Sequence, residues 1–247
     1  MIREALLSAI DRPRPRYKSS GKMRLWVSEL GYCPRKAMLR ITGREPTGEF
    51  PVKIKEVMSL GNSYEDNTFA WLKRYYGPRI TQGIPVGDEN WSGKIDFLLT
   101  HCNETAGGTS WGSAIIEHKA QGGKWFDFNQ NLPRLQHVCQ AWLYGHLLEK
   151  KYPLNSPPKI ILFYRAWGNY AEFEIVPHEG GVRAQGVMND EEVSRWLWVK
   201  PDEKRLELEE WFLRNEVPPL PEGGPSGDCL FRGEPSCSFY DLCWEGG

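Results

Sequence analysis

Residues 94–120 read KIDFLLTHCNETAGGTSWGSAIIEHKA, and two short apolar runs in this stretch decide the fold class. The runs KIDFLLT (94–100) and SAIIEHKA (113–120) have the length and composition of β-strands. The residues between them (101–112) are polar and rich in glycine, as in a hairpin loop. We therefore expect two strands that are neighbours in the chain and can pair with one another.

Helical patterns flank these strands on both sides. Residues 132–150 are amphipathic at the spacing of an α-helix, and residues 54–76 show the same spacing with a soft break at Gly61. The remaining predicted elements are strands at 79–86, 159–167 and 170–177 and a charged helix at 189–215, anchored by Trp196, Leu197 and Trp211. This alternation predicts an α/β fold with a mixed central sheet.

The N-terminal segment 27–43 is also predicted to be helical. Ser28 is a candidate N-cap and Gly43 a candidate stop. Pro34 interrupts the segment, because proline cannot continue a helix without losing a hydrogen bond. Cys33 is therefore expected at a turn between two helical pieces.

The composition is that of an ordinary globular domain. The 247 residues are 40% hydrophobic and 26% charged, which excludes collagen, coiled coil and bulk disorder. No window approaches about 18–20 uninterrupted apolar residues, and the N-terminus lacks the pattern of a secretory signal, so we expect a cytoplasmic protein without membrane contact.

The net charge of −1 conceals an asymmetry along the chain. Residues 1–79 carry a net charge of +8 and residues 80–247 a net charge of −9. A basic N-terminal third is suited to a polyanion such as DNA, although a solvated charged face explains it equally well.

Two carboxylates and a lysine lie on the predicted strand pair. Residues i and i+2 of a strand point to one face, so Glu117 and Lys119 project together and His118 points the other way. If the strands pair, Asp96 reaches the same face as Glu117. Carboxylates bind Mg²⁺, and a lysine beside the metal stabilises the transition state of phosphodiester hydrolysis. Such residues are common on solvated faces, but these follow the apolar run 114–116 of a buried strand.

The flanking helices offer three further polar groups. Glu65, in GNSYE (61–65), can lean over the sheet as a third carboxylate, with Asp66 as an adjacent competitor. Gln140 and Tyr144 are four residues apart and share one helix face, from which both can hydrogen-bond to a phosphate or an extruded nucleotide. Each of these residues taken singly is more typical of an ordinary polar helix edge than of a catalytic site.

The order GxxxE, D, ExK and QxxxY resembles the RecB-type branch of the PD-(D/E)XK nuclease superfamily, over residues 28–144. The resemblance implies a restriction-endonuclease-like core and a metal-dependent deoxyribonuclease, by default an exonuclease, acting on single-stranded DNA or DNA ends. It implies that Mg²⁺ or Mn²⁺ is bound by Glu65, Asp96, Glu117 and the backbone carbonyl of His118. Lys119, Gln140 and Tyr144 complete the implied catalytic set. Related nucleases often carry histidine at the position of Glu65.

Six cysteines are present, and three of them lie in the last 19 residues. A secreted disulfide scaffold is usually shorter and denser in cysteine, so this clustering indicates a metal or cluster site. Cys33 precedes the nuclease motifs, whereas Cys229, Cys237 and Cys243 follow them. Cys139 lies on the apolar side of its predicted helix and is expected in the core.

One cysteine before the core and three after it resembles the layout of RecB-type nucleases that carry a 4Fe–4S cluster. That group includes the CRISPR-associated exonuclease family, the AddB-type helicase–nucleases and related viral proteins. The segments SELGYCPRK (28–36) and SFYDLC (238–243) are similar to its entry and exit motifs, which implies a cluster held by these four cysteines. The gap between Cys229 and Cys237 is seven residues, where the family often has two. Four thiolates bind zinc comparably well, so a structural zinc site is the alternative.

The resemblance also implies one nuclease domain over residues 1–247. Within it, we expect a basic helical segment at 1–53 with the first cluster cysteine, the catalytic core at 54–177, and a C-terminal helix with the cysteine-rich tail at 178–247. No Walker A motif is present, so any unwinding comes from a partner, such as a helicase or a CRISPR or recombination protein.

Three residues are candidate DNA contacts. Arg35 and Lys36 stand beside the first cysteine and are placed to contact phosphates. Trp125, in the glycine-flanked loop QGGKWFDF (121–128), is placed to stack on bases of single-stranded DNA, whereas most of the 11 tryptophans are expected in the core. Two other readings stay open: a non-catalytic DNA-binding or adaptor module with a structural cluster or zinc site, and a zinc protein with no DNA role.

Overall fold

The computed structural model describes residues 23–44, 52–100, 112–120, 132–152, 156–166 and 169–220, and short pieces of the C-terminal segment up to residue 244. Side chains are described from residue 58 onward in the second range. The loop at 101–111, Trp125 and Cys229 lie outside the described residues, so the predictions made for them stay predictions.

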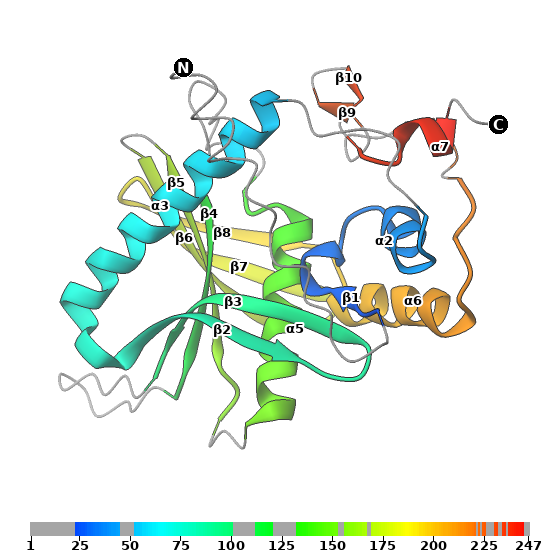
Figure 1. The fold of residues 1–247 in the computed structure, drawn as a ribbon. Coiled ribbons are helices and arrows are strands. Elements are labelled where there is room, and N and C mark those ends of the chain that lie inside the picture. The colour runs from blue at the N-terminus through cyan, green and yellow to red at the C-terminus, as the bar shows by residue number, and fades with distance from the viewer. Residues whose placement is uncertain are drawn as a thin grey trace.

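The helices and strands alternate along the chain (Figure 1). The helical elements are η1 (Val27–Glu29), α2 (Pro34–Ile41), α3 (Val52–Tyr76), η2 (Gly77–Arg79), α5 (Leu135–Lys151), α6 (Pro201–Arg214) and α7 (Tyr240–Trp244). The strands are β1 (Leu25–Trp26), β2 (Ile80–Gly87), β3 (Trp91–Leu99), β4 (Ala114–Ala120), β5 (Lys159–Ala166), β6 (Asn169–His178), β7 (Gly181–Met188), β8 (Glu191–Leu197), β9 (Leu230–Phe231) and β10 (Glu234–Pro235). Of the helices described, none combines the length and apolar composition needed to span a bilayer.

Eight strands form one mixed sheet in the order β1-β3-β4-β5-β6-β7-β8, with β2 paired to β3 outside this path. The pair β4–β5 is parallel and is connected through α5, whereas β2–β3, β3–β4 and the pairs from β5 to β8 are antiparallel. This confirms the predicted α/β fold with a mixed sheet. The predicted pairing of the strands at 94–100 and 113–120 is also confirmed.

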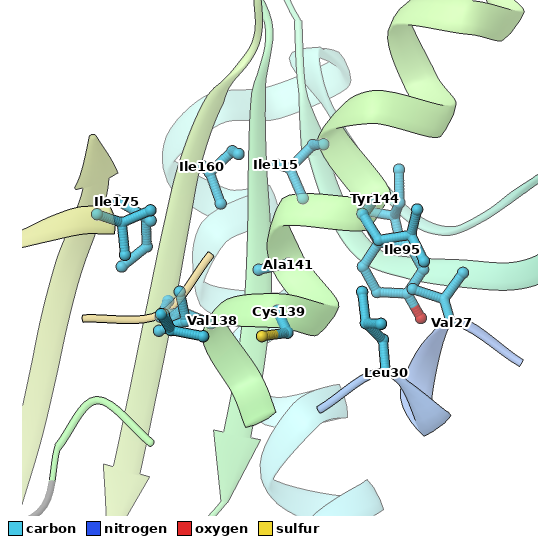
Figure 2. Packing of buried hydrophobic residues seen from close by; sticks show 14 of the residues in the cluster. Val27, Leu30, Ile95, Ile115, Val138, Cys139, Ala141, Tyr144, Ile160 and Ile175 are labelled. Carbon is cyan, nitrogen blue, oxygen red and sulfur yellow. The ribbon is translucent and has the colours of Figure 1, made fainter. Parts of the chain in front are cut away.

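Helices cover both faces of the sheet. Phe69, Leu72 and Tyr76 of α3 pack on a small cluster formed by β2, β3 and β4. The larger cluster lies on the other face, where α5 contributes Val138, Ala141 and other buried residues (Figure 2). Apolar residues at helical spacing thus place α3 and α5 on opposite faces, as Figure 1 shows.

Strands β3 and β4 pair over only part of their length. Their register runs from Leu99 opposite Ala114 to Phe97 opposite Ile116. β1 pairs with the start of β3, at Trp91 and Ser92. Among the described strands, none pairs with the intervening part of β3 on that edge. β3 and β4 therefore diverge just before Phe97, and this opening creates the candidate site.

The backbone of β3 also changes face at this point. Ile95 belongs to the larger cluster and Phe97 to the smaller one, although residues two apart in a regular strand share a face. The β2–β3 register pairs Gln82 with Phe97 and Ile84 with Ile95 but skips Gly83 and Asp96 between them. Gly83 has a φ of +72°, a conformation that residues with a side chain rarely adopt. The irregular backbone around Gly83 and Asp96 lets β3 face α5 first and α3 afterwards.

The prediction of one charged helix over 189–215 is wrong. Residues up to 197 form β8, and α6 begins only at Pro201. Asn189 and Asp190 have φ values of 48° and 69°, so they form a tight turn that joins β7 to β8. β8 is exposed on one face and only partly buried on the other, and it carries adjacent glutamates, so its composition resembles that of a solvated helix. The sheet consequently continues past residue 177, where the core was expected to end.

The N-terminal and α3 predictions need smaller corrections. α3 runs through Gly61 without a break. Trp26, and not Ser28, is the N-cap of η1. Cys33 is the N-cap of α2, between two helical pieces as predicted, because Pro34 occupies the first turn. Gly43, with a φ of +74°, follows the end of α2.

Candidate active site

The six predicted catalytic residues all lie within the described part of the chain. They come from the two strands that border the opening, β3 and β4, and from the two helices that cover the sheet there, α3 and α5. These residues are Glu65 on α3, Asp96 on β3, Glu117 and Lys119 on β4, and Gln140 and Tyr144 on α5.

Asp96 replaces a missing sheet hydrogen bond. Because β3 has diverged from β4, the backbone N–H of His118 has no ladder partner on β3, and it donates to Oδ2 of Asp96 at 2.9 Å. This bond holds the carboxylate of Asp96 at the level of Glu117. Asp96 and Glu117 thus lie close enough across the two strands for each to alter the pKa of the other.

Glu117 is the most buried acid of the site, with 1% of its surface exposed. Its Oε1 accepts a hydrogen bond from Lys119 Nζ at 2.7 Å. Its Oε2 is buried, and no group among the described residues donates to it. A buried carboxylate oxygen without a partner is costly, so this atom calls for a proton or a cation.

The two carboxyl groups favour a shared proton or cation. Burial raises the pKa of Asp96 well above its ordinary value, and the charge of Glu117 raises it further. Burial also raises the pKa of Glu117, although Lys119 opposes this effect. Two acids with raised pKa values at one point are typical of functional sites.

Lys119 connects the acids to α5. Its Nζ donates to Gln140 Oε1 at 2.9 Å as well as to Glu117. Burial lowers the pKa of Lys119, but the charges of Glu117 and Asp96 outweigh burial and the net pKa is raised. Lys119 therefore stays charged at neutral pH, and its position is set from two sides.

Gln140 and Tyr144 face inward. Because Lys119 can only donate, the amide oxygen of Gln140 faces it, and the amide nitrogen is directed to Tyr144 OH at a long 3.5 Å. Gln140 is 6% exposed and Tyr144 is 4% exposed. The Tyr144 ring packs on Gly93, where an added Cβ would lie 2.7 Å from the ring and from Val27. Burial and the charge of Glu117 raise the pKa of Tyr144. Gln140 thus positions Lys119 directly, and Tyr144 contacts Gln140.

Glu65 approaches from the inward face of α3. Its negative charge raises the pKa values of both Asp96 and Glu117, so it lies within electrostatic reach of the pair. Gln82 of β2 donates to Glu65 at 3.2 Å and to Asp66 at 3.3 Å. Glu65 is partly buried whereas Asp66 is exposed, which makes Glu65 the better candidate of the two.

His118 points to the α3 side, as the strand alternation predicted. Its ring lies between Phe97 and Phe163, with centroids 6.0 and 5.8 Å away. Its Nε2 lies 3.1 Å from Thr68 Oγ1, which also accepts a hydrogen bond from Arg165 at 3.0 Å. Burial and the neighbouring positive charges lower the pKa of His118 to about 4, so the ring is neutral at pH 7.

Sequence reasoning missed two groups around the site. Thr68 is 3% exposed and lies on the inward stripe of α3, one turn after Glu65. His137 is 6% exposed, and its Nδ1 lies 2.9 Å from Tyr164 OH. Burial and the charge of Lys119 lower the pKa of His137. A polar residue on an apolar helix stripe was the available signal for both groups.

The acids offer hard oxygen donors suited to a divalent metal. Glu117 Oε2, which accepts no hydrogen bond from the part of the chain that the structure describes and lies beside a second acid of raised pKa, is the atom that such an ion would satisfy. Within the described residues, no three side chains of His, Cys, Asp or Glu are arranged as a metal-binding group. Glu65, which acts on the pair only through its charge, is thus the least established ligand.

The structure brings the two cysteine-bearing segments together. Arg35 of α2 donates to Cys243 Sγ at 3.4 Å and to the Pro218 carbonyl at 2.6 Å. Cys33 caps the same helix, and Cys237 accepts a hydrogen bond at its carbonyl just before α7. Three of the four predicted cluster cysteines therefore lie on segments in or next to this junction. The fourth, Cys229, lies outside the described residues.

Two further predictions can be placed. The guanidinium of Arg35 already donates hydrogen bonds to Cys243 and Pro218. Lys36 is therefore the better candidate for a phosphate contact. Cys139 is 1% exposed in the larger cluster, as expected for a core cysteine, and burial raises its pKa to about 11. None of the described cysteines, Cys33, Cys139, Cys237 and Cys243, is in a disulfide.

Comparison of this chain with protein-family models, with curated proteins and with solved structures finds no match.

Proposed function

We propose that this chain is a metal-dependent deoxyribonuclease with Asp96, Glu117 and Lys119 at its active centre. The observation that carries the proposal is the buried Oε2 of Glu117, which has no hydrogen-bond donor among the described residues and lies beside Asp96 and Lys119. A structural role alone would favour an apolar residue at this position, because burying a charge costs several kcal/mol unless it is fully paired. A metal-dependent hydrolytic site explains why a buried carboxylate is present here despite its energetic cost.

Each residue then has a distinct role. Asp96 and Glu117, with Glu65 and the carbonyl of His118 as further donors, would hold Mg²⁺ or Mn²⁺. When bound, such a metal polarises a phosphoryl oxygen and lowers the pKa of a bound water. Lys119 places a positive charge where negative charge develops in the transition state. Gln140 holds Lys119 in place from the core side, and Tyr144 contacts Gln140.

The arrangement of elements supports a restriction-endonuclease-like core. α3, β2, β3, β4, α5 and β5 follow one another, with α3 and α5 on opposite faces of the mixed sheet. The basic N-terminal third favours DNA as the substrate. Within this proposal, the enzyme is an exonuclease that acts on single strands or DNA ends.

Cleavage of end-labelled DNA tests the proposal. Wild-type protein, purified without oxygen, is incubated with single-stranded and duplex oligonucleotides in Mg²⁺, in Mn²⁺ or in EDTA. We expect cleavage that needs the metal and is lost in Glu117→Gln. The control is Glu174→Gln, because Glu174 also pairs with a lysine of the sheet, Lys159, at 3.4 Å, but outside the site. Metal-independent cleavage, or equal rates in the two variants, would refute the proposal.

We also propose that Cys33, Cys229, Cys237 and Cys243 hold a 4Fe–4S cluster that connects the two ends of the chain. The contact between Arg35 and Cys243, 208 residues apart, supports this proposal. Anaerobic protein should be brown and contain about four irons. Cys243→Ala should lose the iron, whereas the core variant Cys139→Ala should keep it. Stoichiometric zinc in colourless protein would support the structural zinc site instead.

A non-catalytic DNA-binding module is the second candidate. It is favoured by the close ion pair of Lys119 and Glu117 and by the missing three-residue metal group among the described residues. Under this reading, Mn²⁺ does not alter thermal stability. Under the nuclease reading, Mn²⁺ at about 100 times its Kd stabilises the wild type by about 2.7 kcal/mol and stabilises Glu117→Gln much less.

A further inference from the structure

Two large aromatic side chains are exposed on the C-terminal half of α3. Trp71 is 56% exposed and Tyr75 is 79% exposed. Residues four apart on a helix lie on the same face, with Cβ atoms roughly 5–6 Å apart. The two side chains therefore lie on one exposed face of α3, where the Tyr75 ring also meets the Tyr76 ring edge-on with centroids 4.8 Å apart. We call this face the Trp71–Tyr75 platform.

A partly exposed cation of β5, Arg165, packs against the platform. The guanidinium of Arg165 lies 3.8 Å from the centroid of the Trp71 ring and 5.2 Å from that of Tyr64. Arg165 also donates to Thr68 Oγ1 at 3.0 Å, so its orientation is fixed by α3 itself. One face of the indole is covered by this cation, and the exposed area belongs to the remainder of the ring. A single exposed tryptophan is ordinary, but one whose ring is held by an anchored arginine is presented in a defined orientation.

The platform shares an anchor with the candidate active site. Thr68, which accepts the bond from Arg165, also contacts His118 at 3.1 Å. The backbone N–H of His118 holds Asp96. In the sheet register, Arg165 lies beside Ala120, one residue after Lys119. The arginine that packs against the platform therefore lies at the same end of the sheet as Glu117 and Lys119, on the side covered by α3.

The charge around the platform is complementary to nucleic acid. Residues 67–87 contain no aspartate or glutamate and include Lys73, Arg74 and Arg79. Arg74 and Arg79 are exposed. A polyanion can therefore lie along this part of α3 without meeting an acid of the same segment.

We propose that the Trp71–Tyr75 platform stacks unpaired bases of single-stranded DNA, while Arg74 and Arg79 contact its phosphates. Aromatic rings bind single strands with little sequence preference because every base has a π-face. Duplex DNA cannot use the platform without unstacking, so the platform selects single strands. The choice of DNA rests on the proposed nuclease function.

Binding of oligonucleotides without cleavage tests this inference. Fluorescence anisotropy is measured in EDTA with a labelled single-stranded oligonucleotide and with its duplex. Loss of one stacking residue should weaken single-strand binding by about 5- to 150-fold in Trp71→Ala, and duplex binding by less than about twofold. Trp71→Phe should retain most of the affinity. Trp198→Ala, which removes a tryptophan that is 82% exposed elsewhere, should bind like the wild type.

Three further variants separate stacking from folding and from charge. Trp71→Leu keeps an apolar cover over Arg165 but has no π-face, so it should lose affinity while its thermal unfolding stays close to that of the wild type. Tyr75→Ala should also weaken single-strand binding, and its exposed position keeps folding intact. Arg74→Gln should reduce the salt dependence of binding by about one ion, whereas Trp71→Ala leaves this slope unchanged.

Wild-type affinity in folded Trp71→Leu and Tyr75→Ala would overturn the inference, as would equal losses for single-stranded and duplex DNA. These measurements need neither metal nor cleavage. If metal-dependent cleavage is absent but Trp71→Leu loses single-strand binding, the nuclease proposal fails and the platform stands. If Glu117→Gln abolishes cleavage but the platform variants bind normally, the platform fails and the nuclease proposal stands.

Discussion

The carboxylate of Asp96 accepts a hydrogen bond of 2.9 Å from the backbone N–H of His118, across two strands that have stopped pairing with one another. A side chain thus continues the bonding between β3 and β4 where the backbone ladder ends. The same divergence leaves room for Glu117 and Lys119 between the sheet and α5. The site is therefore a consequence of an irregular sheet. Asp96 stabilises the divergence of the two strands and also contributes a carboxyl group to the site.

Neutralising Asp96 should stabilise the metal-free protein. Asp96→Asn keeps an oxygen that accepts from His118 but removes the repulsion with Glu117, so we expect unfolding to require about 1–3 kcal/mol more. Urea denaturation at pH 7 in EDTA measures this difference. The control is Asp88→Asn, which should destabilise, because Asp88 pairs with Lys150 at 2.8 Å and its pKa is lowered. A loss of stability in Asp96→Asn would show that the pair is not strained.

Replacing Lys119 should separate catalysis from DNA binding. We expect Lys119→Ala to lower the cleavage rate on bound DNA by about 10²–10³, the scale of one lost preorganised electrostatic contact. Single-turnover kinetics at saturating enzyme measure that rate, and DNA affinity in EDTA should change much less. Lys159→Ala, a lysine of the same sheet outside the site, should cleave normally. If Lys119→Ala loses affinity but keeps its rate on bound DNA, Lys119 is a docking residue.

Acid should destabilise the fold through His118. Its pKa falls from an ordinary 6.5 to about 4 in the folded state. Between these values the unfolded chain binds the extra proton, so stability is complete above pH 6.5 and falls as the pH decreases toward 4, by roughly 3 kcal/mol. Urea denaturation between pH 4 and 7 should show this dependence and a weaker one in His118→Gln. If the free energy of unfolding depended on pH in the same way in both proteins, the lowered pKa of His118 would be contradicted.

The raised pKa values of Asp96 and Glu117 change stability with pH in the opposite direction to His118: they favour the folded state at low pH. The folded state keeps a proton that the unfolded state has already released, so this pair's contribution decreases as the pH rises above their ordinary values. Comparing Asp96→Asn with the wild type over the same pH range isolates this effect. Their stability difference should grow with pH, and a constant difference would contradict it.

Two glycines of the site should respond oppositely to alanine. An added Cβ at Gly93 would lie 2.7 Å from both the Tyr144 ring and Val27, so Gly93→Ala should cost about 1–3 kcal/mol. At Gly61, inside α3, the nearest atom would be the Ala120 Cβ at 3.8 Å. Gly61→Ala should therefore stabilise the helix by about 0.5–1 kcal/mol. Thermal unfolding distinguishes the two, and equal effects would mean that Tyr144 packs elsewhere.

Local patterns were sufficient to predict most of the elements around the site. The apolar runs at 94–100 and 113–120 are short strands, and the spacing at 132–150 is that of α5. Strand alternation also predicted that Glu117 and Lys119 share a face opposite His118. These features depend on period and composition alone, so they could be identified without knowledge of neighbouring segments.

The same kind of reasoning failed where exposure removes the pattern. β8 is solvated on much of its surface, so its glutamates and tryptophan do not alternate in polarity as a half-buried strand would. The prediction of a helix followed from the charge content, whereas pairing with β7 decided the structure. Pairing is a contact between segments, and the composition of one segment does not encode it.

The sequence by itself determined which side chains the site has available: the acids, the lysine two residues after Glu117, and the glutamine and tyrosine on one helix face. Only the tertiary structure decided how they are used. Glu117 Oε2 is buried without a donor among the described residues, Arg35 joins α2 to Cys243, and Arg165 packs against the Trp71 ring. The physical reason is that burial, charge coupling and strand divergence arise between segments distant in the chain, whereas periodicity is a property of a single segment.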